Sequence, residues 1–187
     1  MKKVILISTL FLLTILLVAA RQNQQTSAPT FEGKTTLLRP VNYREWVFVG
    51  SSLGLSYAQN ASSAGDMYHN VYIKPEAYRE FAKTGKFPEG TVLAMEMASA
   101  DTKKEPALHG SFESEFIGLE VAVKDSSGFP EGGWAYFNFS GGPGSQYRDK
   151  AEPFPASAGC VSCHKQNAAT DNVFTQFYPV LRAVKPK

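Results

Sequence analysis

Residues 67–85 read MYHNVYIKPEAYREFAKTG, and they carry the two clearest local signals in the chain. Side chains over 67–73 alternate between two sets, which is the period of a β-strand. Pro75 then stands where a helix tolerates proline, apolar residues return at helical spacing after it, and Gly85 can end the helix. The stretch therefore predicts a strand followed directly by a helix.

Further alternating segments lie on both sides of this unit. Residues 91–98, 116–124 and 134–139 have a period of two, with glycines near their ends. On the N-terminal side, residues 43–49 predict a helical turn that leads into a strand, and residues 53–66 predict a loop. Hairpin-like strands with few helices predict an α+β fold built on an antiparallel β-sheet.

Length and charge limit the possible functions. The chain has 187 residues, 43% of them hydrophobic, which suits one domain and excludes a large multidomain enzyme. The formal net charge is +2, and the two lysines at positions 2 and 3 account for it. Because no basic cluster lies elsewhere, we expect no nucleic-acid partner.

The N-terminus has the pattern of an export signal. Lys2 and Lys3 precede an apolar run over residues 4–20 that ends in small residues, which predicts cleavage after Ala20 and a periplasmic or otherwise exported protein. The run is slightly shorter than a membrane helix requires, so an uncleaved membrane anchor remains the alternative.

The rest of the chain divides into two parts. Residues 21–36 begin with a stretch rich in Gln, Ser and Thr, which predicts a flexible tether after the signal peptide of residues 1–20. Residues 37–187 contain all the alternating segments. They are expected to form a single domain.

Both cysteines of the chain lie in Gly159-Cys160-Val161-Ser162-Cys163-His164. The Cys-x-x-Cys-His pattern is the attachment signature of a c-type haem. Two thiols on one helical turn can bond the porphyrin vinyl groups, and the adjacent imidazole can ligate the iron. The motif predicts one covalent haem c on a C-terminal helical segment, held by Cys160 and Cys163, with His164 as the metal ligand.

Three other interpretations of the motif remain open. A zinc site would need a fourth ligand such as His69 or His109. A thioredoxin-like dithiol normally follows the first strand of a βαβ unit, whereas this pair lies near the C-terminus. A simple disulfide would leave His164 without a role.

Several stretches of the chain resemble the cytochrome P-460 family, which includes the β-sheet cytochromes called c-prime-beta. The stretches are NYREWVFVG from Asn42, VYIKPEAYREFAKTGKFPEGT from Val71, FIGLEVAVKD from Phe116, GGWAYFNF from Gly132 and CVSCHKQNAATDNVFTQFYPVLRA from Cys160. The resemblance implies a homodimeric, antiparallel β-sheet monohaem cytochrome. It also implies His164 as proximal ligand and an open sixth iron position.

Two functions follow from that resemblance. Members of the enzymatic branch oxidise hydroxylamine and pass electrons to an external redox partner protein, so an exported oxidoreductase acting on hydroxylamine or nitric oxide is one expectation. The alternative is a non-catalytic electron-transfer or nitric-oxide-binding cytochrome of the c-prime-beta kind. Whether the chain is an enzyme therefore depends on its distal residues.

The sequence departs from the enzymatic branch in two places. The branch cross-links a lysine to the porphyrin, and an ungapped alignment from Val71 places Met95 there, so an ordinary c-type haem is expected. The most active members also place a carboxylate over the distal face from the loop before the haem motif. In this chain Glu152 is the last acidic residue before His164.

Other residues are candidates for the walls of a haem pocket. Met95 is expected to pack against the haem or core, with iron coordination as the alternative. His69 is the candidate distal hydrogen-bond donor, against a surface or satisfied core histidine. Glu120 is expected to face solvent in the strand alternation. Phe174, Phe177 and Leu181 lie at helical spacing and are expected to clamp the haem helix.

Overall fold

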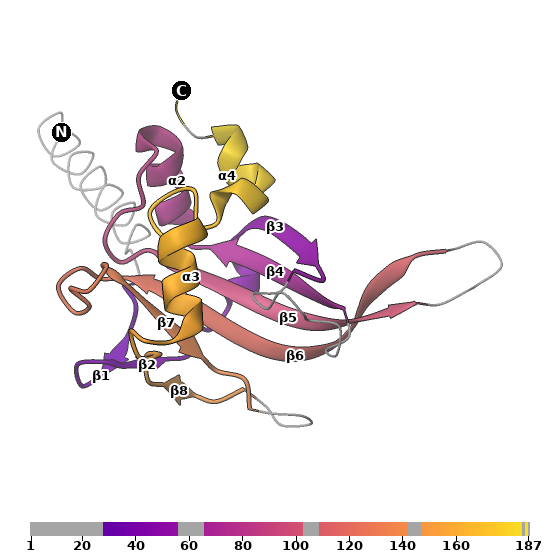
Figure 1. The fold of residues 1–187 in the computed structure, drawn as a ribbon, viewed down its shortest axis with the longest axis horizontal. Helices are drawn as coiled ribbons and strands as arrows, with labels where there is room; N and C mark the ends of the chain where they lie inside the picture. Colours follow the sequence, from indigo (N-terminus) through magenta and orange to yellow (C-terminus); the bar gives the residue numbers. More distant parts are fainter. Residues whose placement is uncertain (1–27, 56–65, 103–108, 142–146, 185, 187) are drawn as a thin grey trace, which may run out of the picture.

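A computed structural model describes residues 28–55, 66–102, 109–141, 147–184 and 186 (Figure 1). The predicted signal peptide lies outside these residues. In chain order the elements are β1 (Phe31–Glu32), β2 (Thr36–Leu38), η1 (Tyr43–Glu45), β3 (Val47–Leu53), β4 (Met67–Ile73), α2 (Pro75–Thr84), β5 (Val92–Thr102), β6 (Ser111–Lys124), β7 (Trp134–Asn138), β8 (Lys150–Ala151), α3 (Gly159–Asn167), η2 (Thr175–Phe177) and α4 (Pro179–Val184).

The strands form two antiparallel sheets. The larger has the order β3-β4-β5-β6-β7, so every strand pairs with its neighbour in the chain. The smaller has the order β1-β2-β8. This arrangement confirms the predicted α+β class with an antiparallel sheet.

The unit formed by β4 and α2 matches its prediction. Pro75 occupies the first turn of α2, where backbone N–H groups have no partner within the helix, so proline costs no hydrogen bond. Gly85 ends the helix in the left-handed region at φ 72°, and its N–H donates to the Phe81 carbonyl at 2.7 Å. Phe81 is fully buried, so the apolar stripe of α2 faces the sheet.

Strands β5 and β6 are longer than the alternation indicated. Their outer parts, residues 100–102 and 111–113, extend as a two-stranded ribbon beyond the rest of the sheet (Figure 1). Every residue over 111–117 is exposed, so no buried face imposes a period of two there. The strands predicted from alternation therefore end close to the point where side-chain burial ends. The backbone pairing between β5 and β6 continues beyond it.

The described fold also begins before residue 37, where the domain was predicted to start. Strand β1 lies inside the range predicted to be a tether, and it pairs with β2. Leu37 of β2 in turn pairs with Ala151 of β8, and both are buried. A two-residue strand has too few side chains to show a period, so no pattern in the sequence predicted it.

The two faces of the large sheet are covered differently. Helices α2, α3 and α4 each contribute buried residues to one core, through Phe81, Val161 and Leu181 among others. The small sheet contributes Leu37 and Ala151 to a second core on the other face. Figure 1 shows the helices on one side of the sheet and β1, β2 and β8 on the other. We call these the helix face and the small-sheet face.

Candidate cofactor site

Helix α3 carries the two cysteines on the helix face. Cys160 and Cys163 are both free thiols and partly buried, and Cys160 packs against the core of that face. Burial raises the pKa of the Cys160 thiol, so the protonated thiol is favoured. The two sulfurs are one helical turn apart in the chain, which suits two attachment points on one flat cofactor.

The His164 ring is held in one orientation. Its Nδ1 lies 2.8 Å from the Asn172 carbonyl oxygen, which can only accept, so Nδ1 carries the proton. The ring packs between Tyr136 and Phe174, with each pair of ring centroids 4.5 Å apart. Nε2 is then the nitrogen whose lone pair can bind a metal, and the backbone hydrogen bond fixes that tautomer.

The surroundings of His164 also favour the neutral imidazole. Burial lowers its pKa, and the hydrogen bond to the Asn172 carbonyl offsets part of this effect. A neutral imidazole is the form that ligates iron. The orientation and the charge state of His164 therefore both suit an axial ligand.

A tight turn presents the Asn172 carbonyl to His164. Asp171 and Asn172 adopt left-handed φ angles of 47° and 59°, which Asp and Asn tolerate better than most residues. The Asp171 carboxylate accepts hydrogen bonds from Trp134 Nε1 at 3.2 Å and Lys124 Nζ at 2.7 Å. Strand ends β6 and β7 thus anchor the turn that orients the imidazole. The adjacent Asp-Asn pair was the signal for this turn in the sequence.

Two neighbouring cavities, of about 220 and 60 Å³, lie between this segment and the sheet. Val71, Met95, Phe174 and Tyr178 line both. Cys163 lines the larger cavity and His164 the smaller. Most of the exposed wall in each is apolar. A mostly apolar space bordered by one thiol and by the imidazole fits a porphyrin.

Met95 and His69 both lie in the walls of these cavities. Met95 pairs with Val71 across the sheet, and His69 lies two residues before Val71 on β4, so the three share a face. His69 lines the larger cavity only. Burial lowers the pKa of its imidazole. The resemblance predicted that both residues lie near the haem motif. In the structure both line a cavity that Cys163 of the motif also lines.

Glu120 is also in a cavity wall, so the prediction that it faces solvent was wrong. It is the cross-strand partner of Met95 and lines the smaller cavity with His164. The error has a physical cause. The sheet is covered on both faces, so a residue on the opposite face from Leu119 and Val121 does not point to water.

The loop before the motif contributes no acid to either cavity wall. Glu152 instead accepts hydrogen bonds from Thr35 at 3.2 Å and from Thr36. Phe154 of the same loop packs against the core of the helix face. Between Glu152 and His164 the chain has no other carboxylate that could serve.

The segment after the motif is not one helix. Phe174 precedes the 3₁₀ turn η2, Phe177 lies within that turn, and Leu181 belongs to the separate helix α4. Phe174 and Phe177 line the larger cavity, whereas Leu181 is buried in the core of the helix face. The expectation of one aromatic helix was wrong because Pro179 starts a new helix.

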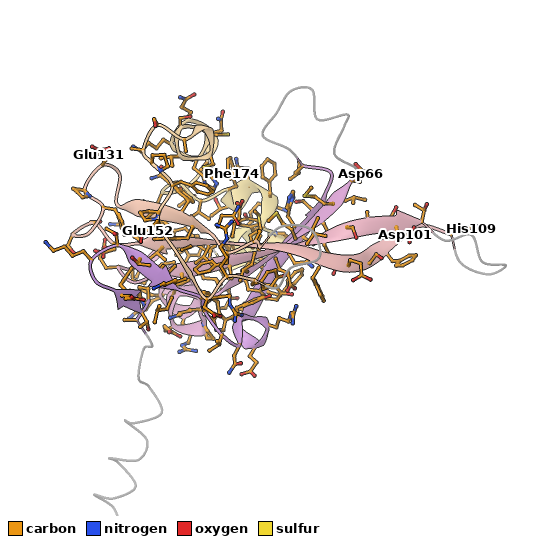
Figure 2. The ribbon with its side chains drawn as sticks, turned by 90° about the horizontal axis from the view of Figure 1, so that it is seen from below. Asp66, Asp101, His109, Glu131, Glu152 and Phe174 are labelled. Carbon is orange, nitrogen blue, oxygen red and sulfur yellow. The ribbon has the colours of Figure 1, made fainter. Side chains whose placement is uncertain are left out.

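The zinc interpretation finds no ligand set in the described part of the chain, where no three His, Cys, Asp or Glu side chains could hold a metal ion together. Among the described residues, neither candidate fourth ligand completes such a set. His69 lines the larger cavity, whereas His109 is exposed near Asp101 at the far end of the ribbon, away from Phe174 (Figure 2). The haem interpretation uses the residues that the fold does bring together.

Comparison with known proteins agrees with this site. The family model for Cytochrome P460 matches residues 40–175, which include the sheet and the Cys-x-x-Cys-His motif. The chain is therefore a haem-binding cytochrome. It belongs to the Cytochrome P460 family. A search of curated proteins finds no match.

Proposed function

We propose that this protein is an exported monohaem c-type cytochrome that binds small nitrogen compounds, hydroxylamine or nitric oxide, at an open position on its haem iron. The observation that carries the proposal is the arrangement of the motif: the oriented His164 lines the smaller cavity, and Cys163 lines the neighbouring larger one. The family match supports haem as the cofactor. One covalent haem is proposed because the chain has one pair of cysteines.

Each group at the site has a role toward the haem. Cys160 and Cys163 would form thioether links, and His164 would ligate the iron through Nε2. Phe174 and Tyr178, which line both cavities, would shield the cofactor from water. Burial raises the pKa of Tyr178 to about 12, so its hydroxyl stays neutral. The bound haem would supply an iron that binds a small ligand and exchanges electrons.

His69 is the proposed donor to a bound ligand. It lies in the wall of the larger cavity, and among the described residues no hydrogen bond or ion pair engages its ring. A buried polar group without a protein partner is available to a ligand. Either ring nitrogen can carry the donating proton.

The residues favour ligand binding over rapid hydroxylamine oxidation. Met95 stands where the enzymatic branch has its cross-linking lysine, and a thioether cannot form that amine link. The loop before the motif supplies no carboxylate to the cavity walls. We therefore expect slow or no turnover and an ordinary c-type haem.

Electron transfer without ligand chemistry is the second candidate. It is favoured by Met95, which lines both cavities and carries a thioether that binds haem iron in many electron carriers. If Met95 ligated the iron, the sixth position would be closed. A redox partner protein is expected under either function.

A homodimer and an exported location are further parts of the proposal. Strand β6 exposes Phe112, Phe116 and Ile117, and Phe116 is 53% exposed, so a second copy could cover these side chains. Export rests on the N-terminal pattern of residues 1–20 and on the need to attach haem c outside the cytoplasm. In the described part of the chain, no helix is long and apolar enough to cross a membrane.

Absorption spectroscopy of the purified holoprotein tests the proposal. A pyridine haemochrome assay should give an ordinary c-type spectrum, and the resting protein should be high-spin and five-coordinate. Addition of nitric oxide or hydroxylamine should shift the Soret band, and replacement of His69 by Leu should speed ligand release. A resting six-coordinate spectrum that disappears in Met95→Leu would instead establish the electron-transfer alternative.

A further inference from the structure

One carboxylate lies in the wall of the smaller cavity. Glu120 of β6 is paired with Met95 of β5, and Met95 is paired with Val71 of β4, so the three form a row across the helix face. The sheet residues beside Glu120 in this wall are apolar, including Leu93 and Ala122. The opposite wall contains His164.

Two other polar side chains in the walls of the smaller cavity, Tyr136 and His164, are already engaged. The Tyr136 hydroxyl donates to the Asn172 carbonyl at 3.3 Å, and His164 Nδ1 shares that carbonyl. Among the described residues, none donates a hydrogen bond to the Glu120 carboxylate or forms an ion pair with it. Burial raises the pKa of Glu120, and no hydrogen bond offsets this.

A second acid in the same sheet shows how the fold satisfies a buried carboxylate. Glu96, next to Met95 on β5, is only 1% exposed and faces the small-sheet side. Its carboxylate accepts hydrogen bonds from the Tyr43 hydroxyl and the Arg44 guanidinium. Glu120 is only partly buried, and no such protein donors surround it, so its carboxylate is left available to a group that enters the cavity.

We propose that Glu120 is the hydrogen-bond acceptor through which this cavity selects small ligands that carry N–H or O–H groups, such as hydroxylamine, over ligands without hydrogen, such as nitric oxide. This inference rests on the proposed function, because it requires a haem with an open position. His69 can donate to either kind of ligand, so it does not discriminate between them. Nitric oxide has no hydrogen to donate, so only the hydrogen-bearing ligand can form a hydrogen bond to a carboxylate oxygen of Glu120.

Ligand titration of the ferric holoprotein tests the inference. Absorption changes would be followed during anaerobic addition of hydroxylamine and, separately, of nitric oxide. The variants are Glu120→Ala, which removes the acceptor, and Glu120→Gln, which keeps an amide acceptor without the charge. Glu115→Ala is the matched control, since Glu115 lies on the same strand but is exposed and lines neither cavity.

Glu120→Ala should weaken hydroxylamine binding by about tenfold or more, because a hydrogen bond to a charged group is lost. Glu120→Gln should lose less affinity for hydroxylamine, because the amide oxygen can still accept a hydrogen bond. Nitric oxide binding should change by no more than about twofold in either variant, and Glu115→Ala should match the wild type. Infrared difference spectra add a second readout. Hydroxylamine should shift the carboxyl bands that vanish in Glu120→Gln, and nitric oxide should leave them in place.

Two results would overturn the inference while leaving the proposed function intact. One is unchanged hydroxylamine affinity in both Glu120 variants. The other is an equal loss for hydroxylamine and nitric oxide, which would mean that Glu120 only shapes the cavity. If the wild-type holoprotein bound neither ligand, the proposed open iron position would fail, and the role of Glu120 would fail with it.

Discussion

Aromatic residues lie on both faces of the five-stranded sheet, but they are packed differently on each. On the small-sheet face, Phe137 is fully buried and contacts Phe31 and Phe129, with ring centroids 6.2 and 6.1 Å apart. On the helix face, Phe174 and Phe177 line a cavity, and Phe177 is 46% exposed. One face is closed by packing between protein side chains. The other keeps space that a cofactor can fill.

The acids show the same difference. Glu96 is neutralised by Arg44 and hydrogen-bonded to Tyr43 on the closed face, whereas Glu120 has no such partners on the open face. A carboxylate that is satisfied within the protein stabilises the fold. One that is left without donors costs stability unless a ligand supplies them. Substitutions on the two faces should therefore have different effects.

Aromatic truncation should give the largest contrast in stability. Phe137→Ala should lower the free energy of unfolding by about 4 kcal/mol, because it leaves a large cavity in a closed core. Phe177→Ala should cost less than about 1 kcal/mol, since the ring is half-exposed and loses little buried contact. Urea denaturation of both holoprotein variants measures the two values. Equal losses would mean that the helix face is packed like the other.

Neutralising the two acids should give a smaller contrast of opposite sign. Glu96→Gln should destabilise the protein by about 2 kcal/mol, because the charge that pairs with Arg44 and accepts from Tyr43 is lost. Glu120→Gln should have no cost or should stabilise slightly, since it removes a half-buried unpaired charge. The same denaturation experiment checks both. A loss in Glu120→Gln as large as that in Glu96→Gln would reveal a structural partner for Glu120.

The pH dependence of stability should identify Glu120 as an acid with a raised pKa. Because burial raises its folded-state pKa, the folded protein binds this proton more tightly than the unfolded chain. Its contribution is fully present below the ordinary Glu pKa of about 4.3 and is lost as the pH rises through the folded value. Stability of the wild type should fall over that window more than stability of Glu120→Gln. Identical pH profiles would contradict the raised pKa.

Replacement of Met95 should have little effect on stability or on the resting spectrum. Met95→Leu conserves volume, so it should change the free energy of unfolding by less than about 1.5 kcal/mol. The resting absorption spectrum should also stay unchanged if Met95 only packs beside the haem. Conversion of a six-coordinate to a five-coordinate spectrum in this variant would show that the thioether binds iron.

The sequence predicted those parts of the fold whose side chains have a period. Strand β4, helix α2 and the antiparallel pairing of the large sheet were predicted from alternation, Pro75 and Gly85. The outer part of β6, residues 111–115, was missed because all of these residues are exposed. Strand β1 was missed because two residues show no period.

The candidate site was predictable where a motif or a resemblance marked it. Cys160, Cys163 and His164 form a local pattern, and the resemblance pointed to Met95 and His69. Glu120 was misplaced because alternation shows which residues share a face and does not show whether both faces are covered. The anchoring of Asp171 by Trp134 and Lys124 joins positions far apart in the chain, so no local pattern revealed it.

Mass spectrometry of the intact protein tests the central claim most directly. The protein would be produced in a bacterial host that matures c-type cytochromes, with Cys160→Ala and Cys163→Ala as paired variants. The wild type should carry one covalently bound haem that survives denaturation, and a double variant should carry none. A wild-type chain without added mass, or a double variant that retains covalent haem, would contradict the proposed attachment through these two thiols.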